Sequence, residues 1–261
     1  MKHQARKRFG QHFLVDENVL SGIAQAIGPL PTDNLVEIGP GLGALTQWVL
    51  KYTGHLKVIE LDRDLAQRLE TGAWADKLTV YQSDVLKFDF SELGPQLRVV
   101  GNLPYNISSP ILFKLLEHID QVQDQTFMLQ KEVIDRMVAQ AGQKDFGRLS
   151  VMLQAYYDME HLFDVPPEAF DPPPKVMSAI VQMVPKPDRL RDGIPHATLA
   201  DLVTSAFSQR RKMLRNNWAN KVSPEQARQV GIELTARAES ISTEQYIELA
   251  QLLDQTANRE T

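Results

Sequence analysis

The sequence of 261 residues predicts an α/β fold with a largely parallel sheet, followed by a small all-helical domain. Three observations support this prediction. Runs rich in Val, Ile and Leu alternate with amphipathic stretches over the first two thirds of the chain, a glycine-rich turn follows the first of these runs, and the sequence beyond Pro195 is helical in pattern. Because such sheets bind ligands at the carboxyl ends of their strands, we expect a site there.

Five runs are predicted as the strands of the parallel sheet, because β-branched, leucine and aromatic residues dominate them. These runs are NLVEIG (34–39), LKVIEL (56–61), LTVYQSD (78–84), LRVVGN (97–102) and QTFMLQ (125–130). Amphipathic stretches between them, such as ALTQWVLKY and DLAQRLETGA, predict crossover helices. Two later runs, RLSVMLQAYY (148–157) and SAIVQMVPK (178–186), are also predicted as strands, with the proline-rich segment VPPEAFDPPPKV between them.

The end of the chain is predicted to be entirely helical. ATLADLVTSAFSQRR, SPEQARQVGI and STEQYIELAQLLDQ each follow a residue that can cap a helix. A proline-containing stretch at 185–195 separates this part from the rest. The sequence therefore predicts two domains, residues 1–185 with the basic N-terminal segment and residues 186–261.

Composition excludes several classes of protein. No run is long enough to cross a bilayer, and the first residues are basic rather than apolar, so we expect a cytoplasmic protein with no membrane partner. The chain has no cysteine, which excludes thiolate zinc sites and zinc-dependent base deaminases. Its six histidines are widely separated, and we expect no metal. A monomer is the default expectation.

Positive charge is concentrated in two runs although the formal net charge is −5. KHQARKRFGQH opens the chain, and SQRRKMLRNNW lies in the predicted helical domain with almost no acid between its cations. Both could contact phosphates of a nucleic acid, and the alternative for each is a solvated face. The candidate RNA-binding residues are Arg6, Lys7, Arg8, Arg210, Arg211, Lys212 and Arg215.

The segment VEIGPGLGALT predicts a cofactor-binding loop. A strand is followed by Gly39, Gly41 and Gly43, which allow a tight turn and a close approach of the backbone to a ligand before a helix begins. Glu60 ends the next strand about 20 residues on, where an acid binds ribose hydroxyls in dinucleotide folds. Asp84 ends the third strand and could accept an adenine amino group. The alternatives are an ordinary turn and a helix-capping acid.

The stretch RVVGNLPYN ends an apolar strand with an amide, a proline and an aromatic ring. Asn102 offers a side-chain carbonyl, and Pro104 leaves the Leu103 carbonyl free of helix pairing, while the ring of Tyr105 offers a flat face. Two acceptors and a ring suit an adenine amine, and they disfavour a nicotinamide enzyme. Acceptors that hold the amine hydrogens favour a pyramidal nitrogen, which can attack a methyl sulfonium in line. The alternative is a proline-directed turn with a packed tyrosine.

Together these motifs, with FGQHFL, GRLSVM and AFSQRRKMLRN, resemble the bacterial ribosomal RNA small-subunit adenine dimethyltransferase family over nearly the whole chain. The resemblance implies a Rossmann-like, S-adenosylmethionine-dependent methyltransferase domain that releases S-adenosylhomocysteine, and a helical domain that docks on RNA. It implies dimethylation of two adjacent adenosines near the 3′ end of small-subunit ribosomal RNA, within a late 30S assembly intermediate, as a step of ribosome biogenesis.

The resemblance also assigns site residues. The implied donor-binding set is His12, Leu14, Gly39, Gly41, Glu60, Leu61, Asp84, Val85 and Asn102. The implied base-binding set is Asn102, Leu103, Pro104, Tyr105 and Phe170. For His12 a backbone contact is expected more than a side-chain role. Phe170, between prolines, would stack on the face of the base opposite Tyr105, and the alternatives are a core phenylalanine or polyproline recognition by a partner.

Two other functions stay open at this point. One is a different adenine methyltransferase, acting on large-subunit RNA as resistance enzymes do, or on DNA; the predicted C-terminal domain and the FGQHFL opening speak against both. The other is a non-catalytic assembly factor for which methylation is incidental.

Overall fold

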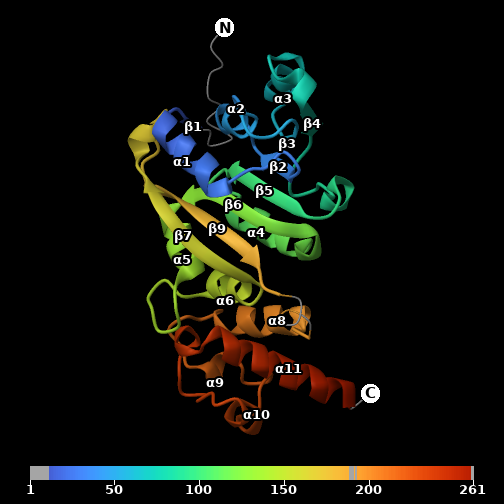
Figure 1. Cartoon of the computed structure of the whole chain (residues 1–261). Helices are drawn as coiled ribbons and strands as arrows, with labels where there is room; N and C mark the ends of the chain where they lie inside the picture. Colours follow the sequence, from blue (N-terminus) through green and yellow to red (C-terminus); the bar gives the residue numbers. More distant parts are fainter. Residues whose placement is uncertain (1–11, 188–190, 192, 260–261) are drawn as a thin grey trace. The chain divides into compact units, whose positions relative to one another are not determined.

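The computed structural model of the chain describes residues 12–187, 191 and 193–259, which form two compact units (Figure 1). Unit 1 comprises the chain up to Ile134 together with Glu160–Pro185, and unit 2 comprises Asp135–Met159 and the chain from Lys186. The predicted domains, 1–185 and 186–261, differ from these units because Asp135–Met159 pack with the C-terminal residues. Within the described residues, no helix has the length and apolar character needed to cross a membrane.

Unit 1 is built on a seven-stranded sheet in the order β4-β3-β2-β5-β6-β9-β7. The strands are β2 (Asn34–Ile38), β3 (Leu56–Glu60), β4 (Leu78–Gln82), β5 (Leu97–Asn102), β6 (Val122–Gln130), β7 (Tyr157–Val165) and β9 (Ser178–Pro185). The first five strands in this order are parallel, and β9 runs antiparallel to β6. The predicted α/β class and the five predicted parallel strands are confirmed.

The order of the strands reverses between β2 and β5. From β2 the chain continues outward through β3 and β4, whereas β5 returns to the other side of β2 and is followed by β6. Gly101 allows the two central strands to approach closely, because a Cβ atom there would lie 2.5 Å from the carbonyl oxygen of Ile38. In open α/β sheets a ligand binds at the carboxyl ends of the strands at such a reversal.

Helices connect the strands of unit 1 (Figure 1). They are α1 (Glu17–Ile27), α2 (Ala44–Val49), α3 (Arg63–Thr71), α4 (Ser108–Leu116) and α5 (Lys131–Val138), whose last residues belong to unit 2. Short 3-10 turns lie at η2 (Ala75–Lys77), η3 (Phe90–Leu93), η4 (Ile119–Gln121) and η5 (Pro167–Ala169). A separate two-stranded ribbon pairs β1 (Phe13–Leu14) antiparallel with β8 (Phe170–Asp171).

A buried charge cluster supports the amino-terminal end of β5. The guanidinium of Arg98 contacts Asp33 at 2.5 Å and Asp124 at 2.9 Å, and all three side chains are nearly buried. Arg98 also donates to the carbonyls of Ile27 and Gly28 at the end of α1. Because a buried cation is tolerated only when it is paired, this cluster joins α1, β5 and β6 as one structural element.

One predicted strand is wrong. Residues 148–154 of RLSVMLQAYY form α6 (Arg148–Gln154), and the strand β7 begins only at Tyr157. The helix is favoured at its start because the hydroxyl of Ser150 accepts a hydrogen bond from the backbone N–H of Gly147 at 3.0 Å. The run is apolar throughout, and periodicity alone does not distinguish a buried helix from a buried strand.

Unit 2 is helical, as predicted for the end of the chain. Besides α6 it contains α8 (His196–Ala206), α9 (Leu214–Asn217), α10 (Pro224–Gln229), η6 (Ala238–Ser240) and α11 (Thr243–Arg259). Trp218 and Tyr246 are fully buried and pack edge to face, with ring centroids 6.0 Å apart. Their polar atoms are satisfied, since Trp218 donates to the Leu202 carbonyl and Tyr246 to that of Ala238.

Candidate active site

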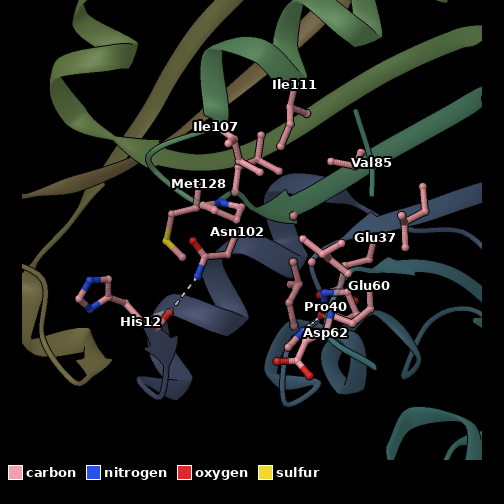
Figure 2. A pocket seen from close by; sticks show the side chains of 18 of the residues that line it. His12, Glu37, Pro40, Glu60, Asp62, Val85, Asn102, Ile107, Ile111 and Met128 are labelled. Atoms are coloured by element: carbon pink, nitrogen blue, oxygen red, sulfur yellow. Dashed lines mark hydrogen bonds between the residues drawn. The ribbon is translucent and has the colours of Figure 1, made fainter. Parts of the chain in front are cut away.

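A cavity of about 290 Å³ lies in unit 1 at the carboxyl ends of the central strands (Figure 2). It is lined by the loops that follow β2, β3, β4 and β5, and by the residues of β1. The sequence-predicted residues that line it are His12, Leu14, Gly39, Gly41, Glu60, Leu61, Asp84, Val85, Asn102, Leu103, Pro104 and Tyr105. The cavity therefore lies at the reversal of strand order, where the fold class places a ligand.

The glycine loop after β2 has positive φ angles, which residues with a side chain rarely adopt. Gly39, Gly41 and Gly43 have φ values of 66°, 59° and 84°. The loop is tied to the sheet by the N–H of Gly39, which donates to the Ile59 carbonyl at 2.9 Å. A Cβ atom on Gly43 would lie 2.7 Å from the ring of Trp74, so glycine is required there by space as well as by conformation.

Glu60 at the end of β3 holds this loop in place. One carboxylate oxygen accepts the N–H of Gly41 at 3.1 Å, and the other accepts the N–H of Asp62 at 2.8 Å. Burial raises the pKa of Glu60, while the hydrogen bonds from these two N–H groups lower it. Glu60 therefore joins the glycine loop to the loop after β3, and each carboxylate oxygen can accept a further hydrogen bond.

Glu37 is a cavity residue that the sequence analysis did not assign. It is 2% exposed at the end of β2 and accepts a hydrogen bond from the hydroxyl of Thr46 at 2.6 Å. Burial raises the pKa of Glu37 to about 7; the Thr46 hydrogen bond opposes this rise and the nearby Glu60 adds to it. A carboxyl two residues before the glycine loop is the local signal that could have identified it.

The far end of the cavity is formed by the loops after β3 and β4. Leu61 is 49% exposed although it is apolar, and Val85 is 7% exposed. Asp84 uses one oxygen to accept the N–H of Leu86 at 3.0 Å, which leaves the other for a ligand. Apolar side chains together with one acceptor suit a flat heteroaromatic ring that carries an amino group.

The loop after β5 presents two acceptors to the cavity. The amide nitrogen of Asn102 donates to the His12 carbonyl at 3.3 Å, as Figure 2 shows, so its oxygen lies on the other side of the amide. Neither this oxygen nor the Leu103 carbonyl accepts a hydrogen bond from any residue that the structure describes. Asn102 and Leu103 both line the cavity, so each of the two oxygens is available there as an acceptor.

Tyr105 is fixed beside these acceptors. Its hydroxyl hydrogen-bonds with that of Ser178 at 2.6 Å, and its ring stacks on the ring of His12 with centroids 5.9 Å apart and planes 22° apart. Nδ1 of His12 donates to the Pro172 carbonyl at 2.8 Å. Burial raises the pKa of the Tyr105 hydroxyl. Ser178 was not identified from the sequence, because it lies 73 residues from Tyr105.

Phe170 is not brought to the cavity. It is 3% exposed, belongs to the hydrophobic core of unit 1 and pairs with Leu14 in the β1–β8 ribbon. The alternative of a core phenylalanine in a rigid loop therefore describes its position in this structure. The pairing of β8 with β1 holds its backbone and the core encloses its ring, so a contact with a base would require the ring to leave the core.

The four basic residues predicted in the helical domain are exposed, and they do not share one helix. Arg210, Arg211 and Lys212 follow the end of α8, and Arg215 lies on α9. The Ala206 carbonyl at the end of α8 accepts a hydrogen bond from the Asn217 amide at 2.5 Å, which satisfies one of the carbonyls left unpaired at a helix end.

Arg210 has partners that the sequence did not reveal. It forms an ion pair with Glu239 at 3.0 Å and donates to the carbonyls of Lys144 and Phe146. It is thereby neutralised and holds the loop before α6. The other predicted basic residues, Arg6, Lys7 and Arg8, lie outside the described residues. Among the residues described, no group of His, Asp or Glu side chains is arranged to hold a metal ion.

A family profile and individual related proteins both identify the same family. The family profile described as ribosomal RNA adenine dimethylase matches residues 2–255. A protein of Bordetella petrii called ribosomal RNA small subunit methyltransferase A is 59% identical over 256 residues, covering 97% of this chain and 96% of its own. A protein of the same name from Dechloromonas aromatica is 51% identical, covering 96% of this chain and 98% of its own.

Solved structures share the fold. A dimethyladenosine transferase from Plasmodium falciparum superposes with a TM-score of 0.82 at 24% identity, covering 94% of this chain and 98% of that one. The 23S rRNA methyltransferase ErmE superposes with a TM-score of 0.72 at 24% identity, covering 93% and 99%. At this identity the likeness concerns the fold alone.

Proposed function

The chain belongs to the ribosomal RNA adenine dimethylase family and is an S-adenosylmethionine-dependent methyltransferase, and we propose that it dimethylates two adjacent adenosines near the 3′ end of 16S ribosomal RNA. The observation that supports this most directly is the anchored amide of Asn102, whose oxygen and the neighbouring Leu103 carbonyl are two acceptors at the cavity. The proposed acceptor is a late small-subunit assembly intermediate in the cytoplasm, which the protein meets as a monomer.

We propose that the glycine loop and the ends of β3 and β4 hold the methyl donor. S-adenosylmethionine carries an adenosine, an amino acid and a sulfonium whose methyl group is electrophilic. Glu60 would bind the ribose hydroxyls, Leu61 and Val85 would enclose the adenine, and Asp84 would accept its amino group. Gly39 and Gly41 would meet the amino-acid part, while His12 and Leu14 close the cavity. The backbone geometry of the glycines and the free acceptor of Asp84 fit such a molecule.

The residues after β5 would hold the target base. The oxygen of Asn102 and the carbonyl of Leu103 would accept the two amine hydrogens, which favours the pyramidal nitrogen of the attack. Pro104 fixes the turn, and Tyr105 would stack on the base. Phe170 would add a second stacking face only after leaving the core, so we propose that contact for Tyr105. Alignment of two bound reactants can supply roughly 7–11 kcal/mol of a barrier, so no strong base is needed.

Unit 2 and the N-terminal segment would bind the RNA backbone. Arg211, Lys212 and Arg215 are exposed, and Arg6, Lys7 and Arg8 are assigned by sequence alone. Arg210 is assigned to the same surface, although its guanidinium is engaged within unit 2.

The direct test compares the RNA of cells with and without this protein. Mass analysis should show two dimethylated adenosines near the 3′ end of small-subunit RNA that disappear with the gene. The purified protein should methylate unmethylated small subunits and not large subunits. Methylation of large-subunit RNA instead would favour the resistance-type activity, and no methylation of either would contradict the proposal.

A further inference from the structure

The proline-rich segment after Phe170 touches the cavity at both of its ends. At one end the Pro172 carbonyl accepts a hydrogen bond from His12, and at the other the Ser178 hydroxyl bonds that of Tyr105. His12 and Tyr105 both line the cavity. The segment therefore lies along the rim beside the proposed base-binding residues, although its own middle residues do not line the cavity.

The middle of this segment is exposed and combines two apolar side chains with one positively charged side chain. Val176 is 40% exposed and Met177 is 38% exposed, which places them among the few large apolar side chains that face solvent. Lys175 beside them is exposed and forms no ion pair with any described residue. Adjacent apolar side chains that remain exposed beside a binding cavity indicate a surface that contacts a ligand.

The backbone of this segment is restrained at both ends. Three prolines precede Lys175, and their fixed φ angles limit the freedom of the chain. The Met177 carbonyl accepts the N–H of Lys131 at 3.0 Å, and β9 begins at the next residue. The backbone of such a restrained segment loses little conformational entropy when it binds a ligand.

We propose that Lys175, Val176 and Met177 form a subsite for the nucleotide that adjoins the target adenosine, an inference that rests on the proposed function. Lys175 contacts its phosphate, and Val176 and Met177 cover the face of its base, which is exposed once the target base has left the stack. The occupant is RNA because the rim is continuous with the proposed base-binding residues and carries a cation, Lys175, that pairs with no described residue.

The first test measures methyl transfer to unmethylated small subunits at saturating donor. Lys175→Gln and Met177→Gln should each raise KM for the subunit by roughly fivefold or more, as loss of a base contact does. Lys175→Gln should also reduce the salt slope, the slope of the logarithm of the subunit binding constant against the logarithm of the salt concentration, by about 0.7. Donor affinity should be unchanged. The controls are Lys77→Gln and Leu30→Gln, which alter an exposed cation and an exposed apolar residue near the amino ends of the strands.

The second test locates the RNA without using activity. Because the chain has no cysteine, Met177→Cys carries a single thiol to which an iron chelate can be attached. Hydroxyl radicals from this chelate should cleave the RNA next to the adenosines that the wild-type protein methylates, and Leu30→Cys should not. If small subunits are methylated but cleavage falls elsewhere and both Gln variants keep the wild-type KM, the subsite is wrong. If the wild type methylates no small subunits, the proposed function itself fails.

Discussion

The amide nitrogen of Asn102 and the backbone carbonyl of His12 are joined by a hydrogen bond of 3.3 Å. The bond fixes which way the amide faces, because only the nitrogen can donate to a carbonyl. The amide oxygen is left as an acceptor at the cavity, 90 residues away in sequence from the residue that orients it. The segment before α1 therefore orients a side chain that we propose binds the base.

Asn102→Ala should lower the rate of methyl transfer far more than the affinity for small subunits. A preorganised hydrogen-bonding group that acts mainly on the transition state is worth roughly 10²–10³ in rate. Asn102→Asp keeps an acceptor and should retain more activity than the alanine variant. Single-turnover transfer at saturating donor checks this. If Asn102→Ala transfers methyl groups at the wild-type rate, Asn102 does not bind the amine and the loop is an ordinary turn.

Glu60→Ala should weaken binding of S-adenosylmethionine. The variant loses a charge-assisted hydrogen bond, which contributes about 1.5–3 kcal/mol. The N–H groups of Gly41 and Asp62 also lose their acceptor, so the glycine loop should become more mobile. Titration calorimetry measures the affinity, and Glu70→Ala, an exposed acid on α3, is the control. Unchanged affinity in a folded variant would remove Glu60 from the donor site.

Glu37→Gln should change how stability depends on pH. The pKa of Glu37 in the folded protein is about 7, above its ordinary value of 4.5. Between these values the folded state binds a proton that the unfolded state lacks, so the contribution of Glu37 to stability decreases as pH rises. Thermal unfolding at about pH 5 and about pH 8 checks this. Relative to wild type, the variant should be more stable at the higher pH than at the lower one. If the difference in stability between variant and wild type is the same at both pH values, the pKa of Glu37 is not raised.

Arg98→Ala should destabilise unit 1 strongly. Removal of one partner from a buried ion pair costs about 3–5 kcal/mol, because the charges of Asp33 and Asp124 stay buried without a cation. The matched control is Arg228→Ala, whose partner Glu225 is exposed and whose loss should cost less than about 1 kcal/mol. Denaturant unfolding compares the two. Equal losses would mean that burial of the Arg98 cluster contributes nothing.

Arg210 and its neighbours should respond differently to the same substitution. Arg210→Gln breaks contacts with Glu239 and the loop before α6, so amide exchange at Gly142 should accelerate. Arg211→Gln and Lys212→Gln should leave exchange unchanged and reduce the salt slope of subunit binding by about 0.7–0.9 each. Hydrogen-exchange mass spectrometry and binding at several salt concentrations separate the two effects. Identical responses from all three variants would show that Arg210 has no internal role.

Some of the site follows from residues that are neighbours in sequence. Glycines are needed at positions 39, 41 and 43 because the loop backbone adopts positive φ angles there. The residue type alone therefore indicates a tight loop at these positions. Acids and amides that follow predicted strands, such as Glu60 and Asn102, share one edge of the sheet because parallel strands end there. For these residues a strand pattern and a residue type were sufficient.

What the sequence by itself determined was therefore the α/β class, the parallel strands, the helical end of the chain and twelve of the 28 described residues that line the cavity. The tertiary structure alone decided that RLSVMLQ is helical, that Phe170 lies in the core, that Glu239 neutralises Arg210 and that Ser178 and His12 fix Tyr105 and Asn102. The reason is physical: periodicity and backbone preference act between adjacent residues, whereas these contacts depend on strand register and on loops that meet only after folding.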